Sequence, residues 1–145
     1  MAQPLFTQTP NVSAVPVTAA NTQSGGVGTI ATNIFLAWTA GSGGGFIEKV
    51  RWILTGTTAN TTSTATVGRV FLSTQASGAT TAADTHMVHE ITLPSLTADS
   101  STGASFFLDI AINVAVPAGM TVLVTNHAAP AANTAWKAVV YGGNY

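Results

Sequence analysis

The sequence predicts an all-β domain, a β-sandwich that is jelly-roll-like, preceded by an extended N-terminal arm. Three observations predict it. Runs of β-branched and aromatic residues recur at short spacing between Gly, Ser and Asn loops. No segment shows a helical period with capping residues. The length of 145 residues fits one domain that can build a core without disulfides or metals.

The first 28 residues differ in composition from the rest. Pro4, Pro10 and Pro16 recur at near-regular intervals, and proline favours extended backbone and edge positions. We therefore expect an extended arm over 1–28, with one short edge strand at 12–17, followed by a β-sandwich domain over 29–145. Apolar residues favour an arm that lies against another surface, with a disordered tail as the alternative. The predicted partner contacts in this arm are Leu5, Phe6, Val12, Val15 and Val17.

Seven strands are expected after the arm. Alternation of apolar residues or enrichment in β-branched and aromatic residues predicts each of them. They cover 29–39, 46–54, 64–73, 87–93, 106–114, 120–125 and 134–141. In 46–54, the spacing places Lys49 and Arg51 on the face opposite Trp52. The stretches 75–85 and 94–103 are expected to be loops, and Gly68 to mark a bulge or a close backbone approach.

Alternation is clearest in 106–114, where Asp109 falls on the outward face. Seven strands of this kind indicate a sandwich, either a jelly roll or an immunoglobulin-like fold. The absence of cysteine removes the Cys–Trp–Cys pattern of immunoglobulin domains and favours the jelly roll.

Charge is the largest compositional deviation. Charged residues form 6% of the chain, against about 25% in ordinary soluble domains. Thr, Ser, Asn and Gly fill the surface instead, which predicts a subunit whose faces are covered by neighbours. A β protein with a Thr-rich exterior is the alternative. The net charge of −1 argues against nucleic-acid binding. Polar residues and a turn interrupt the longest apolar region, so no membrane span is predicted.

Residues for catalysis or metal binding do not gather in a recognisable pattern. His86 and His89 stand near Glu90, but residues i and i+3 of a strand face opposite sides, so only a bulge at Met87 would let them converge. The acidic residues are separated by long loops: Asp84, Asp99 and Asp109. The sequence therefore predicts no enzyme, no catalytic residue, no metal and no cofactor.

Aromatic residues occupy two kinds of position. The three tryptophans, Trp38, Trp52 and Trp136, fall on predicted strands, where core packing is favoured over carbohydrate binding. Tyr141 and Tyr145 flank a double glycine at the C-terminal end and are predicted as further partner contacts.

Several segments together resemble small structural proteins of bacteriophage virions, of the capsid decoration (cement) type. The resemblance covers about residues 28–145 and is carried by 46–51 with 55–57, 66–72, 89–94, 116–122 and 138–145. Asn144 departs from the Gly-Gly-Asp-Tyr ending of such chains, which leaves any role of a terminal acidic residue in doubt.

The resemblance implies a jelly-roll-like subunit, a trimer, bound to the major capsid protein on the outer capsid surface and stabilising the shell. It also implies an arm that reaches across the lattice or into a sister subunit. Our hypothesis is that Leu5, Phe6 and residues 12–17 anchor this arm, so deletion of residues 1–25 should abolish lattice binding and leave a folded core. The alternatives are a tail-fibre, baseplate or head-fibre module with receptor or carbohydrate binding, and a small jelly-roll enzyme.

Overall fold

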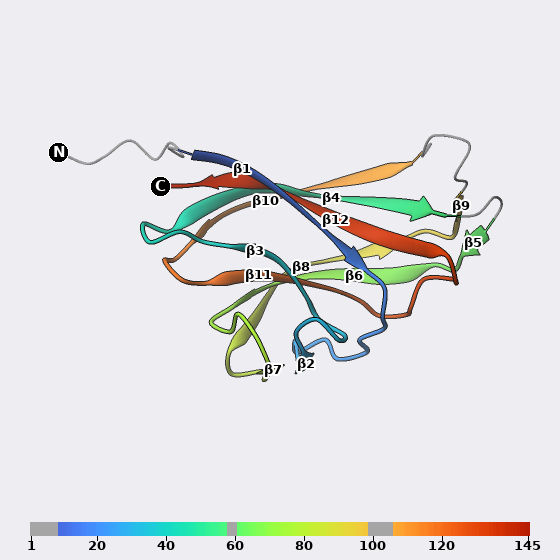
Figure 1. The fold of residues 1–145 in the computed structure, drawn as a ribbon, viewed down its shortest axis with the longest axis horizontal. Coiled ribbons are helices and arrows are strands. Elements are labelled where there is room, and N and C mark those ends of the chain that lie inside the picture. Colours follow the sequence, from blue (N-terminus) through green and yellow to red (C-terminus); the bar gives the residue numbers. More distant parts are fainter. Residues whose placement is uncertain (1–8, 58–60, 99–105) are drawn as a thin grey trace.

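The computed structural model describes residues 9–57, 61–98 and 106–145, and every regular element in these ranges is a β-strand. Two four-stranded antiparallel sheets lie face to face (Figure 1), which confirms the predicted all-β sandwich. Sheet A has the order β1 (Thr9–Val17), β12 (Thr134–Asn144), β4 (Gly45–Gly56), β10 (Phe107–Val116). Sheet B has the order β3 (Phe35–Thr39), β11 (Thr121–Asn126), β6 (Thr66–Ser73), β8 (Thr85–Leu93). Within the same ranges, no helix is long and apolar enough to cross a membrane.

Strands from distant parts of the chain are neighbours in both sheets. The first strand, β1, pairs with the last strand, β12, and β3 pairs with β11. This strand order is compatible with a jelly roll. The sandwich is confirmed, and the jelly-roll topology remains a prediction. Four short strands form two further pairs, β2 (Gly28–Thr29) with β7 (Ala79–Thr80) and β5 (Thr61–Ser63) with β9 (Leu96–Ala98).

The main core fills the space between the two sheets. Trp52 and Trp136 are fully buried there, with side chains from both sheets around them. Gly68 lies directly against this core, because an added Cβ would stand 3.0 Å from the side chains of both Trp52 and Leu93. The close-approach interpretation of Gly68 is therefore correct, while the bulge in β6 and β8 falls between Val70 and Phe71.

The predicted strand 29–39 is wrong in its first half. The chain turns at residues 31–33, where Ala31 has a φ of 69° and its N–H donates to the Ile34 carbonyl. The Asn33 side chain accepts a hydrogen bond from the Thr29 N–H at 2.7 Å, and such an Asx contact favours a turn over a strand. The predicted loops 75–85 and 94–103 also miss β7 and β9, which are too short to show a period.

The N-terminal segment contributes a strand to the sandwich. β1 pairs antiparallel with β12 at every position from Thr9 to Val17, and Val17 is fully buried in the core. Residues 9–17 therefore lie against their own domain rather than leaving it as an arm. The expectation that a chain lacking residues 1–25 keeps an intact core is revised accordingly. Leu5 and Phe6 lie outside the described residues.

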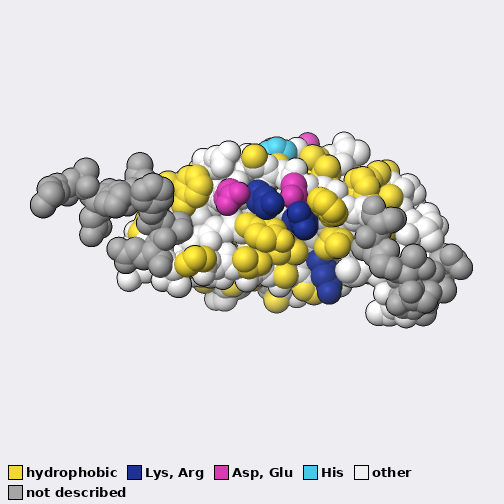
Figure 2. Space-filling model, turned by 90° about the horizontal axis from the view of Figure 1, so that it is seen from above, with side chains coloured by type: hydrophobic (Ala, Val, Ile, Leu, Met, Phe, Trp, Pro, Cys, Tyr) yellow, Lys and Arg dark blue, Asp and Glu magenta, His cyan; other side chains and the backbone are white. Residues whose placement is uncertain are grey.

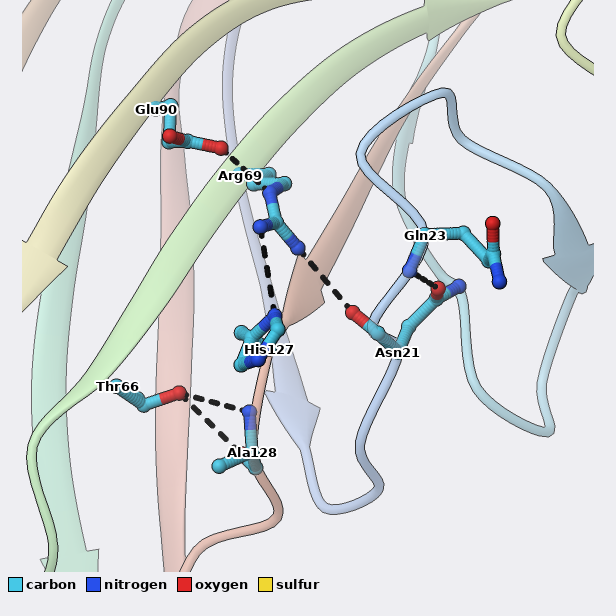
Figure 3. Close-up of polar contacts among 7 residues, drawn as sticks. All are labelled: Asn21, Gln23, Thr66, Arg69, Glu90, His127 and Ala128. Carbon is cyan, nitrogen blue, oxygen red and sulfur yellow. Dashed lines mark hydrogen bonds and ion pairs between the residues drawn. The ribbon is translucent and has the colours of Figure 1, made fainter.

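A buried arginine fixes two loops on the outer side of sheet B (Figure 3). The Arg69 side chain donates from Nε to Glu90 Oε2 at 2.6 Å and from Nη1 to the Asn21 carbonyl at 3.2 Å. Its Nη2 lies 3.5 Å from His127 Nδ1. Since Asn21 belongs to the β1–β2 loop and His127 to the β11–β12 loop, one guanidinium holds both segments.

Replacement of Arg69 by Ala should lower the free energy of unfolding by about 2–3 kcal/mol, because it leaves the buried Asn21 carbonyl without its donor. Urea unfolding followed by tryptophan fluorescence measures this loss. Lys137→Ala removes an exposed cation and should change stability by less than about 0.5 kcal/mol. Equal effects of the two substitutions would show that Arg69 contributes no more than a surface charge.

Candidate interaction surface on sheet A

The outer face of sheet A carries a continuous set of side chains defined by the strand register. Directly paired residues of antiparallel strands share a face, so the register of β1, β12, β4 and β10 gives three rows across the sheet. We call these twelve residues the sheet A surface: Val12, Tyr141, Lys49 and Ala111; Ala14, Val139, Arg51 and Asp109; Pro16, Lys137, Ile53 and Phe107.

Hydrophobic side chains dominate this surface. Val12 on one edge strand is 61% exposed and Phe107 on the other is 54% exposed. Figure 2 looks onto this side of the molecule and shows hydrophobic side chains around a small central group of charged ones. Exposed aliphatic and aromatic residues with a few charges among them are typical of a protein–protein contact.

The central charges form a triad. Arg51 donates from Nε to Asp109 Oδ1 at 2.6 Å and from Nη2 to Asp109 Oδ2 at 2.8 Å, a two-pronged contact. Lys49 Nζ donates to the same Oδ2 at 3.1 Å. The Arg51 hydrogen bonds, followed by that from Lys49, hold the pKa of the Asp109 carboxyl well below its usual range despite partial desolvation. The same contact raises the pKa of Arg51.

Aromatic rings hold the two cations in place from the sides. The Arg51 guanidinium carbon lies 4.1 Å from the centre of the Phe107 ring and 5.8 Å from that of Tyr141. Lys49 Nζ lies 4.9 Å from the centre of the Tyr141 ring. Cation–π contacts of this length orient charged side chains on a sheet surface before any partner arrives.

Asp109→Asn should make stability less sensitive to acid. Because the folded-state pKa of Asp109 lies below its ordinary value of 3.8, its ionised form stabilises the fold above that value. This contribution is lost as the pH falls further, toward the folded-state pKa. Thermal unfolding between about pH 7 and pH 2 should therefore show a shallower acid decline for the variant. Parallel profiles for variant and wild type would contradict the role of the triad.

The predicted partner contacts separate into distinct positions. Val12 and Tyr141 stand directly opposite each other on the sheet A surface. Val15 packs against the core and Val17 lies inside it, so neither is presented to a partner. Tyr145 is half-buried at the C-terminal end, where its N–H donates to the Gly44 carbonyl.

Several residues of the sheet A surface were not predicted, namely Phe107, Ile53, Lys137 and the triad. For the triad, the signal was the alternation within 46–54 and 106–114, which placed Lys49, Arg51 and Asp109 outward. It did not show that these two strands are neighbours.

A bulge does lie between the two histidines, at Val88 rather than at the predicted Met87. The β8 bulge pairs His89 with Val70 and His86 with Leu72, two residues that share a face of β6. No group of three or more metal-binding side chains exists among the described residues.

Asp84 is bonded within its own turn to Thr81, and Asp99 lies outside the described ranges. All three tryptophans are buried, so none is presented to a sugar.

Comparisons with known proteins add little. No family model matches the sequence. No curated protein matches it either. Among solved structures, the chain is similar to one described as "Cyanophage Pam1 capsid asymmetric unit", with a TM-score of 0.43 and 16% sequence identity over 98% of this chain and 91% of that chain. A similarity of this degree carries no argument about the function of the present chain.

Proposed function

We propose that this chain is a non-enzymatic structural subunit of a bacteriophage capsid, a decoration protein that binds the outer lattice and stabilises the shell. The observation that carries the proposal is the sheet A surface, an exposed apolar face with preset charges. The chain around it has only 6% charged residues. The resemblance of its sequence motifs to phage decoration proteins supports the same function.

A surface built on β-strands suits a lattice contact. The sheet A surface stands on strands rather than loops, so little conformational entropy is lost when a partner covers it. Aromatic residues and Arg are enriched at the centres of protein interfaces, and Tyr141, Phe107 and Arg51 are grouped here. Burial of Val12 and Phe107 would supply the apolar component of binding.

Three of the five acidic side chains make contacts that fit a structural function. Asp109 is held by two cations and Glu90 by Arg69. Asp84 accepts bonds from the backbone and hydroxyl of Thr81. A general base works best with a pKa near the operating pH, whereas its cation partners hold the pKa of Asp109 well below its usual range.

Assembly as a trimer on the major capsid protein would raise the strength of attachment. Three copies of one modest contact act together, because the first bound subunit raises the local concentration of the others. A shell stabilised in this way needs neither a cofactor nor catalysis.

Co-sedimentation of the purified protein with undecorated phage capsids tests the proposal, with light scattering to give its mass. The protein centrifuged alone controls for self-pelleting. A trimer that saturates capsids at a stoichiometry matching a symmetry axis is the expected result. A monomer that stays in the supernatant would contradict the proposal, and a screen against host surface glycans would then test the fibre or baseplate alternative.

A further inference from the structure

The accessible cations of the chain all face one way. The sequence has four Lys and Arg residues, and three of them, Lys49, Arg51 and Lys137, belong to the sheet A surface. The fourth, Arg69, is only 6% exposed and lies on sheet B. A chain with a net charge of −1 therefore presents its positive charge on a single face.

This positive charge is only partly neutralised within the chain. Asp109 serves both Lys49 and Arg51. Lys137 is exposed and has no ion-pair partner among the described residues. Even with the exposed Glu48 of β4 counted, the three cations of the sheet A surface outnumber two carboxylates, Glu48 and Asp109.

The charge of the sheet A surface argues against two kinds of partner, a second copy of this chain and a nucleic acid. If a second copy bound face to face through the same surface, two surfaces with excess positive charge would meet, and like charges in contact oppose association. Nucleic acid requires many clustered cations to displace counterions, whereas this surface has three cations among aliphatic and aromatic side chains.

We propose that the sheet A surface docks onto a protein surface that is apolar and carries carboxylates, with Lys137 as the cation that meets them and Phe107, Tyr141 and Val12 as the apolar contacts. This inference rests on the proposed function, in which that partner is the capsid lattice. Arg51 already contacts Asp109 and Phe107, so its main effect is to fix the positions of these neighbouring side chains. Lys137 is therefore the cation that can form an ion pair with a carboxylate of the partner.

Capsid binding of Lys137 variants at low and high salt tests this proposal. Lys137→Gln should weaken binding roughly fivefold at low salt and flatten its salt dependence, whereas Lys137→Arg should keep both. Ser77→Glu is the matched control: it changes the net charge equally, on an exposed loop beside sheet B. Equal weakening by Lys137→Gln and Ser77→Glu, or an unchanged affinity and salt response for Lys137→Gln, would overturn it.

A second measurement does not depend on the capsid. Amide shifts of the labelled protein are recorded during titration with a soluble peptide that alternates Glu with Leu, and with its counterpart carrying Lys for Glu. Shifts in β4, β10 and β12 with the acidic peptide alone would support the inference. Shifts elsewhere, or equal shifts with both peptides, would overturn it. If the protein fails to bind capsids but shows shifts with the acidic peptide alone, the proposed capsid function is rejected. The inference that the sheet A surface recognises an apolar, acidic partner is then kept.

Discussion

A chain that lacks residues 1–17 is expected to unfold, whereas a chain that lacks only residues 1–8 should stay folded. β1 pairs with β12 along its whole length, and Val17 is fully buried. Its removal deletes this ladder of hydrogen bonds and exposes the core beneath it. The combined cost is on the order of 5 kcal/mol, comparable with the total stability of a domain.

Circular dichroism and thermal unfolding of the two truncated chains measure this difference. The shorter truncation, ending before Thr9, keeps every strand of sheet A and is the internal control. If the chain starting at residue 18 unfolds at the wild-type temperature, β1 is dispensable and the domain begins later than the structure indicates. The shorter truncation is also the right one for testing whether Leu5 and Phe6 bind the lattice.

Phe107→Ser is expected to reduce capsid affinity by at least about 30-fold while leaving the fold intact. Phe107 is 54% exposed, so its loss creates no core cavity. It stacks on Arg51 at the β10 edge of the sheet A surface, and exposed aromatic and arginine side chains contribute much of the binding energy of protein interfaces. Binding isotherms from co-sedimentation give the change in affinity.

Met87→Ser provides the matched control for Phe107→Ser. Met87 is 47% exposed and pairs with Phe71, whose side chain belongs to the separate cluster on the outer side of sheet B. This substitution removes a similar exposed hydrophobic side chain from the opposite side of the molecule. Loss of binding by Met87→Ser with normal binding by Phe107→Ser would move the interface to sheet B.

The strands could be predicted from the sequence because their signal is local. Alternation marked residues 106–114, and the structure places β10 over nearly the same range. The same reasoning failed at Ala31, where a hydrogen bond from the Thr29 N–H to the Asn33 side chain favours a turn within a β-rich run. Sequence reasoning also assigned residues 9–17 to an arm outside the domain. The pairing of Thr9 with Asn144 joins the two ends of the described chain, and no local pattern reveals a contact over that distance.

The sheet A surface could be predicted only in part for the same physical reason. Lys49 and Arg51 were correctly placed outward on one strand and Asp109 outward on another. Their contact depends on the pairing of β4 with β10, which are about 60 residues apart. Opposite charges at outward positions of two strands are a usable signal for such pairing, although many pairings satisfy it.

Oxidative footprinting of the protein, free and bound to undecorated capsids, tests the central claim most directly. It reports on Phe107 and Tyr141 of the sheet A surface and on Met87 of sheet B in one experiment. We predict that bound capsid protects Phe107 and Tyr141 while Met87 is oxidised at the same rate in both states. Protection of Met87 with Phe107 and Tyr141 unchanged, or no protection at capsid concentrations that saturate binding, would contradict the account.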